Sequence, residues 1–258
     1  MQYYDQHLHT YFSYDCREQF ENYLKKADQF LVTTEHLDLR NIRVHKDSLF
    51  DYDEYRAKID QLNRDYKTEV LAGIEIGYLK SVHDRTLDFL KGKEFDIKLL
   101  SFHQNQEFSF LDPIVYSLDP IAHLIEYLEI MLAGIKDFND VNVLAHFDFG
   151  FRLLDISLEE FIKHGEKYLI EIFQEAIAHN IALELNTRSM YQYDKLVLYH
   201  YAIDLYKQLG GDLFILNSDA HSVSYYEFQF EAAFQVLKKH QIKYLTVFQK
   251  GEAIKVAI

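Results

Sequence analysis

The sequence has a single cysteine, Cys16, among 258 residues, together with two prolines, nine glycines and no tryptophan. One cysteine excludes an intramolecular disulfide framework and a zinc site built from several thiolates. Any metal site must therefore use histidine, aspartate and glutamate side chains. The low proline and glycine content also excludes a collagen-like chain and a disordered chain rich in these residues.

Long hydrophobic runs and basic residues are also scarce. No apolar run reaches the roughly 18 residues that a membrane span needs, and the N-terminus lacks the basic and apolar regions of a signal peptide. We therefore predict a cytoplasmic protein with no membrane partner. The 27 Lys and Arg residues stand against 41 Asp and Glu, and the net charge of −14 repels nucleic acid. A small-molecule substrate is expected, and the sequence carries no signal for an oligomeric state.

Hydrophobic residues make up 48% of the chain, which is enough for one large core. Short runs rich in Val, Ile, Leu, Phe and Tyr alternate with longer amphipathic stretches, as is typical of βα units and a parallel sheet. No repeat or flexible linker interrupts this pattern, so residues 1–258 are predicted to form a single domain. The expected strands lie near residues 3–7, 30–34, 70–76, 97–102, 141–145, 181–185, 213–217 and 244–248.

Helical periodicity is clearest over residues 158–178, where Ser157 and Glu160 fit a capping box at the start. A second helix is predicted over residues 195–209, and Gly210 with Gly211 suits a left-handed end to it. Residues 11–14 and 40–52 are predicted to be loops, either of which could cover a site.

Polar side chains follow seven successive expected strands at the point where each strand ends. Because the carboxyl ends of parallel strands meet on one face, we expect these side chains to build a single site for several metal ions. They are His7 and His9, Glu35 and His36, Glu75, His103, His146, Glu184 and Asn186, and Asp219 and His221. The other seven histidines fall in predicted helices or loops and are interpreted as structural or solvent-exposed.

Two of these strand ends repeat one spacing. Alternate residues of an extended strand point the same way, so His7 and His9 can reach one cation, and Asp219 and His221 have the same geometry. Asp5 lies on the same face as His7. Its carboxylate could orient an imidazole N–H, or it could be a solvated group at the start of the strand.

Six short motifs spread over residues 1 to about 225 contain most of these residues. They are Asp5-Gln6-His7-Leu8-His9-Thr10, Thr34-Glu35-His36, Gly73-Ile74-Glu75-Ile76-Gly77, Ser101-Phe102-His103, Leu144-Ala145-His146 and Asn217-Ser218-Asp219-Ala220-His221. In this order they resemble the polymerase and histidinol phosphatase (PHP) family. The length of the chain and the lack of an attached polymerase are most similar to the stand-alone histidinol-phosphate phosphatases of that family.

The resemblance implies an α/β fold, a distorted TIM-like (β/α)7 barrel with two to three divalent cations (Zn, Mn or Fe) at its C-terminal face. Mapped onto this sequence, it implies three sets of ligands. The first cation would take His7, His9, Glu75 and Asp219; the second would take His103 and His146 with Glu75 bridging; and the third would take Asp15, His36 and His221.

Asp15 departs from the family pattern, because many members have a histidine at this position. A carboxylate is a harder ligand, so Asp15 could favour manganese or iron over zinc, or lower the occupancy of the third site. Alternatively, Asp15 could cap the helix expected to begin near Glu18.

The resemblance also implies hydrolysis of L-histidinol phosphate to L-histidinol and phosphate, a late step of histidine biosynthesis. Several cations suit a phosphate monoester, because they neutralise its oxygens and lower the pKa of bound water. A hydroxide that bridges two cations would attack phosphorus in line. The candidate catalytic residues are Glu75, Asp219 and His221; Asp219 or a metal-bound water would protonate the leaving oxygen.

Four further residues are candidates for contact with the small phosphorylated substrate. Arg152 and Arg188 follow the fifth and sixth expected strands and could hold the phosphate in a forked geometry, or form surface ion pairs. Glu184 and Asn186 could bind the ammonium or imidazole group of the substrate, or could buttress the metal ligands.

Other functions are weighed beside this one. An enzyme of the same family could act on another phosphate ester, such as a phosphotyrosine protein, a sugar phosphate or a nucleotide, whereas the net charge disfavours an exonuclease. A metal-dependent amidohydrolase would share the His-x-His strand and a late aspartate, but not the added Glu75, His103 and Asp219-x-His221. A metal-storage module would bind cations without catalysis, and the order of the ligands along the strands disfavours it.

Overall fold

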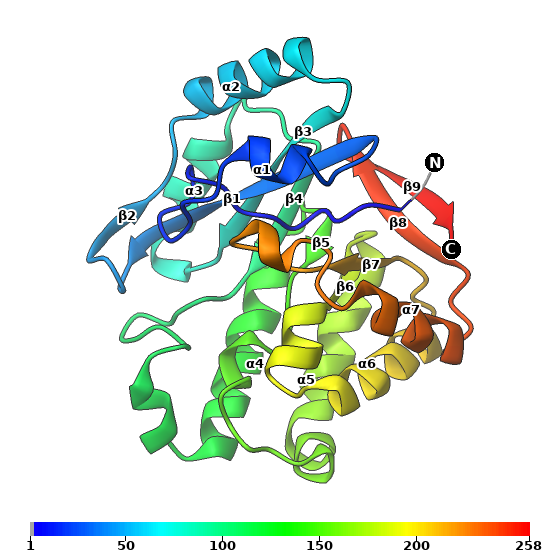
Figure 1. Cartoon of the computed structure of the whole chain (residues 1–258). Helices are drawn as coiled ribbons and strands as arrows, with labels where there is room; N and C mark the ends of the chain where they lie inside the picture. The colour runs from blue at the N-terminus through cyan, green and yellow to red at the C-terminus, as the bar shows by residue number, and fades with distance from the viewer. Residues whose placement is uncertain (1–2) are drawn as a thin grey trace.

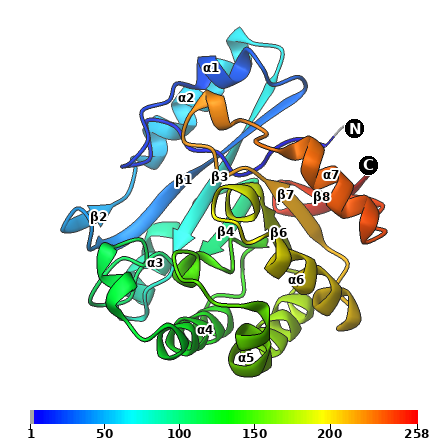
Figure 2. The same cartoon turned by 60° about the horizontal axis from the view of Figure 1, so that its bottom comes forward.

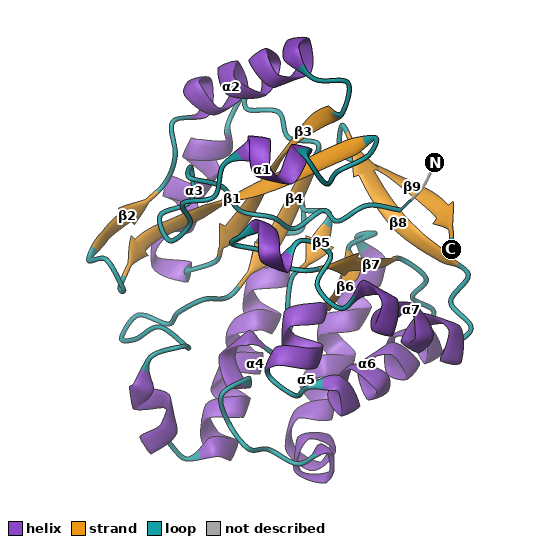
Figure 3. Ribbon diagram, viewed as in Figure 1, coloured by secondary structure: helices purple, strands orange, loops and turns teal. Residues whose placement is uncertain are grey.

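Parallel strands form the centre of the molecule (Figure 1). The computed structural model describes residues 3–258. Its main sheet has the strand order β2-β1-β3-β4-β5-β6-β7, and within this sheet only β2 runs antiparallel to its neighbour (Figure 3). The strands are β1 (Phe30–Asn41), β2 (Lys46–Ser48), β3 (Glu69–Gly77), β4 (Ile97–Ser101), β5 (Val143–Leu144), β6 (Ala182–Asn186) and β7 (Phe214–Asn217). Strands that follow one another along the chain are therefore mostly neighbours, as βα units predict.

Helices connect the parallel strands and surround the sheet (Figure 2). They are α1 (Phe20–Leu24), α2 (Tyr52–Asp65), α3 (His83–Leu90), α4 (Pro120–Asp137), α5 (Leu158–Ala178), α6 (Leu196–Gln208) and α7 (Phe230–Lys239). The capping box of α5 is confirmed: the Glu160 N–H donates to Ser157 Oγ, and the Ser157 N–H donates to the Glu160 carboxylate. Beyond α6, Gly210 is left-handed (φ 96°) as predicted. Gly211 is not left-handed; a Cβ there would lie 2.3 Å from the ring of Tyr206.

The predicted first strand, residues 3–7, is not a regular strand. Leu8 makes one isolated parallel bridge with Ala220, the Ala220 N–H donates to the carbonyl of His7, and the Thr34 N–H donates to the carbonyl of Leu8. Side chains replace the rest of the ladder, since the amides of Gln6 and His7 donate to the side chains of Asn217 and Asp5. The extended segment thus lies between β1, which it contacts at Thr34, and the residues that follow β7, and it closes the sheet. The expected α/β fold, a distorted TIM-like barrel, is confirmed.

Two other expectations need correction. The predicted loop 40–52 contains the end of β1, the strand β2 and the start of α2, because β1 continues to Asn41 and turns back as a hairpin. The eighth predicted strand is β8 (Tyr244–Gln249), which pairs with β9 (Glu252–Ala257) in a separate antiparallel sheet and not with the barrel strands. The Gln6 side chain ties β8 to the N-terminal segment by hydrogen bonds to the carbonyl of Thr246 and the N–H of Phe248.

Aromatic side chains fill much of the core, as the composition predicts. The largest fully buried side chains are Tyr23, Tyr55, Tyr127, Tyr199, Tyr206, Phe20, Phe102, Phe110, Phe147, Phe151, Phe161 and Phe173. Within residues 3–258, none of the helices combines the length and apolarity needed to cross a bilayer.

Candidate metal centre

The nine predicted metal ligands converge at the carboxyl ends of the parallel strands. We call them the ligand cluster: His7, His9, Asp15, His36, Glu75, His103, His146, Asp219 and His221. Seven of them line one pocket of about 290 Å³, while His7 and His9 are fully buried beside it. The topology explains this convergence, because every parallel strand ends on the same face.

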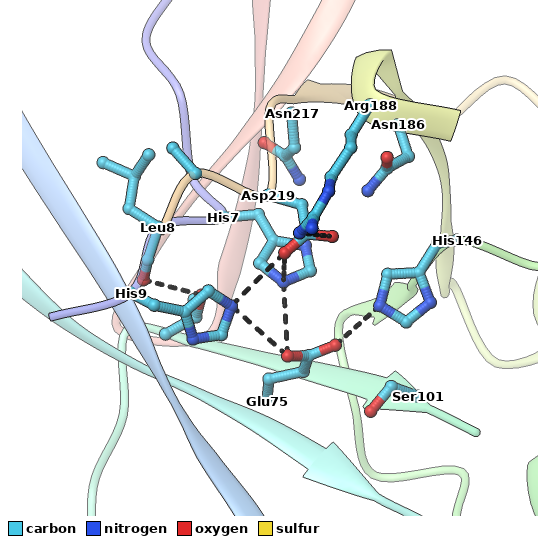
Figure 4. Close-up of polar contacts among 12 residues, drawn as sticks. His7, Leu8, His9, Glu75, Ser101, His146, Asn186, Arg188, Asn217 and Asp219 are labelled. Carbon is cyan, nitrogen blue, oxygen red and sulfur yellow. Dashed lines mark hydrogen bonds and ion pairs between the residues drawn. The ribbon is translucent and has the colours of Figure 1, made fainter. Parts of the chain in front are cut away.

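Glu75 lies at the middle of the ligand cluster (Figure 4). Its Oε1 lies 2.7 Å from His146 Nε2 and 3.1 Å from His103 Nε2. Its Oε2 lies 3.4 Å from the Nε2 atoms of both His7 and His9, and 3.0 Å from Nδ1 of His36. The carboxylate of β3 therefore faces five imidazoles, with one oxygen on each side of the cluster.

The buried donor set fits divalent cations. His7 Nε2, His9 Nε2 and Glu75 Oε2 are buried and make no hydrogen bond within the described residues, which is costly for polar atoms removed from water. These three residues offer ligand atoms that all lie within 4.8 Å of one another, and Glu75, His103 and His146 do the same. The second group is the set that the family resemblance implies for the second cation, and the first group is the set implied for the first cation without Asp219.

The third predicted set also comes together. Asp15 Oδ1 lies 3.4 Å from His36 Nε2 and 3.6 Å from His221 Nε2, and His9, His36 and His221 form another group with ligand spacing. Asp15 does not cap a helix, because α1 begins at Phe20 and Gln19 occupies its N-cap position. Burial opposes ionisation of Asp15, but His36 and His221 hold its pKa far below the usual value.

Asp38 belongs to this neighbourhood, although the sequence analysis did not select it. Its Oδ1 lies 2.9 Å from His103 Nδ1, and its Oδ2 lies 3.7 Å from His36 Nδ1. The signal was the spacing His36-Leu37-Asp38, which matches the two other alternating pairs. It was missed because the strand was expected to end at residue 34, whereas β1 continues to Asn41.

Glu184 and Asn186 lie behind the ligand cluster and not in the pocket. Both side chains are fully buried and neither lines the cavity. Glu184 Oε1 lies 2.7 Å from His7 Nδ1, and its Oε2 accepts hydrogen bonds from the His146 N–H and the Asn186 side chain. This geometry favours the buttressing alternative over contact with substrate, since carboxylates behind metal-binding imidazoles fix their orientation.

Asp5 has neither of its two expected roles. It is buried, so it is not a solvated carboxylate, and it accepts hydrogen bonds from Ser218 and from the backbone of His7 and Glu227 instead of from an imidazole. Burial raises the pKa of Asp5 to about 7 despite these bonds. Glu35 is likewise buried and holds Thr10 and Ser13, so it shapes the chain beside the cluster.

The position of Asp219 suits coordination of a metal ion better than donation of a proton. Its Oδ1 lies 3.6 Å from His9 Nε2 and 3.8 Å from His7 Nε2, and its Oδ2 lies 3.5 Å from Arg188 Nη1 (Figure 4). Burial opposes the charge, but Arg188 and the imidazoles hold the pKa of Asp219 well below its usual range. A carboxylate that stays ionised is a poor general acid at neutral pH, which weakens the predicted role of Asp219 as the acid.

Cationic side chains line the same pocket. Arg152, Arg188 and Arg43 are all among its lining residues. The sequence analysis selected the first two but not Arg43, which comes from the hairpin between β1 and β2 and lay in a predicted loop. Four carboxylates, those of Asp15, Asp38, Glu75 and Asp219, line it as well, so the three arginines would favour an anionic substrate only together with bound cations.

Comparison with known proteins agrees with this geometry. The model of the PHP domain family matches residues 5–188 of this chain. The chain belongs to the PHP domain family. The family predicted from the motifs is therefore confirmed.

The similarity to known relatives extends over most of the length of this PHP protein. A Clostridium acetobutylicum protein named a probable histidinol-phosphatase is 26% identical over 245 residues, which are 93% of this chain and 94% of the relative. The Lactococcus lactis histidinol-phosphatase is 26% identical over 84% of this chain and 83% of its own. A crystal structure of the Lactococcus lactis histidinol phosphate phosphatase with zinc, L-histidinol and phosphate has the same fold, with a TM-score of 0.85, 22% identity, and coverage of 97% of this chain and 98% of that one.

Gly77 lies at the end of β3, and a substitution at this position tests how closely the ligand cluster is packed. A Cβ at this position would lie 1.7 Å from Asp38 Oδ1, so Gly77→Ala must displace the carboxylate that contacts His103. We expect metal affinity to fall by roughly 10-fold or more, as for other losses of an imidazole's partner. Metal content after dialysis against a graded chelator series measures this. Gly165→Ala in α5 is the control, and equal metal retention in both variants would contradict the expectation.

Proposed function

We propose that this PHP protein is a metal-dependent phosphoric monoester hydrolase that converts L-histidinol phosphate to L-histidinol and phosphate. The observation that carries the proposal is the convergence of His7, His9, His103 and His146 on Glu75 beside a pocket lined by arginines. The full-length similarity to proteins named histidinol-phosphatase supports the choice of substrate. A single domain spanning residues 1–258 and a place in the cytoplasm belong to the same proposal.

Each cation would be held by the ligand set predicted for it. His7, His9, Glu75 and Asp219 would hold the first; Glu75, His103 and His146 the second; and Asp15, His36 and His221 the third. When bound, the cations would neutralise phosphate oxygens and lower the pKa of coordinated water. Zinc, manganese and iron all accept this mixture of imidazole and carboxylate ligands.

The protein's own residues would bind and orient the ester. Arg152 and Arg188 would contact the phosphate with their N–H groups, since guanidinium groups bind phosphate oxygens in pairs. His221 is the most exposed imidazole of the ligand cluster, with a side chain 24% accessible. Its Nδ1 faces the carbonyl of Asp219 at 3.1 Å, which leaves Nε2 directed toward the pocket side occupied by Asp15. With Nδ1 facing this carbonyl and Nε2 facing Asp15, His221 would serve as a ligand of the third cation, and a metal-bound water is the remaining candidate to protonate the leaving oxygen.

Phosphate release from a panel of esters tests the proposal. Chelator-stripped protein, resupplied separately with zinc, manganese or iron, would be assayed with L-histidinol phosphate, phosphotyrosine, a sugar phosphate and a nucleotide. We expect selective turnover of L-histidinol phosphate that depends on added metal. Preferential turnover of another ester would overturn the substrate, and metal binding without any phosphate release would overturn the activity and direct attention to amide substrates.

Asp15 provides a test of metal preference. We expect Asp15→His to raise the retention of zinc relative to manganese, because imidazole is a softer ligand than carboxylate. Metal analysis after competition between equal concentrations of the two ions measures the ratio. Asp140→His, at a surface side chain that is 96% exposed, is the matched control. An unchanged zinc-to-manganese ratio in Asp15→His would remove Asp15 from the proposed ligands.

A further inference from the structure

Arg152 is a buried cation with a dedicated set of partners. Only 3% of the residue is exposed, yet it lines the pocket of the ligand cluster. Its Nε lies 3.7 Å from Oδ2 of Asp148, which is fully buried and accepts a hydrogen bond from the hydroxyl of Tyr199 at 2.8 Å. Removing a guanidinium from water is costly unless a carboxylate compensates its charge; Asp148 supplies that charge, although Arg152 Nε and Asp148 Oδ2 make no hydrogen bond within residues 3–258.

The orientation of the guanidinium is fixed from three further sides. The ring centroids of Phe149 and Tyr193 lie 4.4 and 4.9 Å from Arg152 Cζ. The Nη2 group donates to Ser189 Oγ at 2.7 Å. The hydrogen bond to Ser189 uses Nη2 alone, which leaves Nη1 for a ligand in the pocket.

Ser189 also connects this arginine to the ligand cluster. It lies in the π-helical turn Arg188–Gln192 that follows β6, and its N–H donates to the side chain of Asn186 at 2.9 Å. Asn186 in turn donates to Glu184, whose other oxygen faces His7. The same turn presents Arg188 toward Asp219 (Figure 4). One buried network therefore links Arg152 to the proposed metal ligand His7, and the turn that carries Ser189 also carries Arg188.

We propose that Ser189 is a positioning residue that holds Arg152 ready for the phosphate of the substrate. The inference rests on the proposed function, since it assumes that Arg152 binds a phosphate dianion. A free arginine side chain loses rotamer entropy when it is ordered. Anchoring by Ser189 removes that cost from the binding step, because the side chain is already ordered before substrate arrives.

A double-mutant cycle on the metal-loaded enzyme tests the inference. We expect Ser189→Ala to raise KM and the inhibition constant of inorganic phosphate by about tenfold, the effect of losing one hydrogen bond to a charged group, with little change in kcat. In an Arg152→Ala background, the same substitution should change either constant less than twofold, because its partner is gone. In an Arg188→Ala background it should keep its full effect, since it acts on the other arginine.

A control separates positioning from general loss of stability. Tyr206→Phe removes another fully buried hydrogen bond, from the Tyr206 hydroxyl to the carbonyl of Ile181, which precedes β6 at the end of the strand opposite the pocket. This variant should lower the melting temperature without changing KM or phosphate inhibition. The same rise in KM for Tyr206→Phe as for Ser189→Ala would overturn the positioning role.

The outcomes also separate this inference from the proposed function. If Arg152→Ala leaves KM and phosphate inhibition unchanged, the proposed contact between Arg152 and phosphate fails. If Arg152→Ala raises both constants but Ser189→Ala raises neither, only the positioning role fails. An equal effect of Ser189→Ala with and without Arg152 would mean that Ser189 acts independently and would likewise overturn the inference.

Discussion

Glu75→Gln is expected to reduce kcat/KM by at least about 10³-fold and to lower the bound metal in the same step. The carboxylate faces His7, His9 and His36 with one oxygen and His103 and His146 with the other. Glutamine keeps the shape but removes the charge that would bridge two cations, and its NH₂ group cannot coordinate either of them. Loss of the metals removes most of the charge stabilisation of the transition state.

Two measurements check this result on the same preparations: metal per chain by elemental analysis, and phosphate release from L-histidinol phosphate. Glu69→Gln is the matched control, because Glu69 begins the same strand but is exposed. We expect the control to keep its metal and its activity. A Glu75→Gln enzyme with full metal content and more than a tenth of the activity would show that the central carboxylate does not bridge the cations.

The spacing of polar residues at strand ends was sufficient to predict eight of the nine residues of the ligand cluster, whereas Asp15 was implied only by the family resemblance. Each such residue follows a hydrophobic run that is recognisable without any partner, and parallel topology then brings the strand ends to one face. The pairs His7-x-His9 and Asp219-x-His221 needed only the two-residue period of extended chain. Information of this kind is local in the sequence and needs no knowledge of contacts between distant residues.

What the sequence did not reveal depends on contacts between distant residues. The segment containing His7 is held by side chains such as Asn217, which lies more than 200 positions away, so a regular ladder was expected where one bridge exists. The roles of Glu184 and Asn186 stayed open for the same reason: a carboxylate in the pocket and one behind an imidazole have the same local pattern. Asp38 was missed through a strand end placed too early.

Glu184→Gln is expected to lower metal affinity by about 10- to 100-fold although the side chain is not itself a proposed ligand. Glu184 Oε1 accepts from the Asn217 side chain and lies 2.7 Å from His7 Nδ1, while Oε2 accepts from the His146 N–H. This arrangement turns His7 Nε2 toward Glu75. An amide has only one acceptor oxygen, so its NH₂ group must face either His7 and Asn217 or the His146 N–H and Asn186, and that pair of buried groups loses its acceptor partner.

The loss of that partner should also reduce the free energy of unfolding, by about 1–3 kcal/mol. Asp96→Asn separates the two effects, because Asp96 accepts from the backbone amides of Ala72 and Lys250 and precedes β4, at the end of the strand opposite the ligand cluster. We expect Asp96→Asn to lower stability without changing zinc affinity in a competition titration. If Glu184→Gln bound zinc as tightly as the unmodified protein while losing stability, Glu184 would serve the fold alone, and the orientation of His7 would have to come from Glu75 and its neighbours. A loss of affinity confined to Glu184→Gln would instead place the carboxylate behind the imidazole among the determinants of the metal centre.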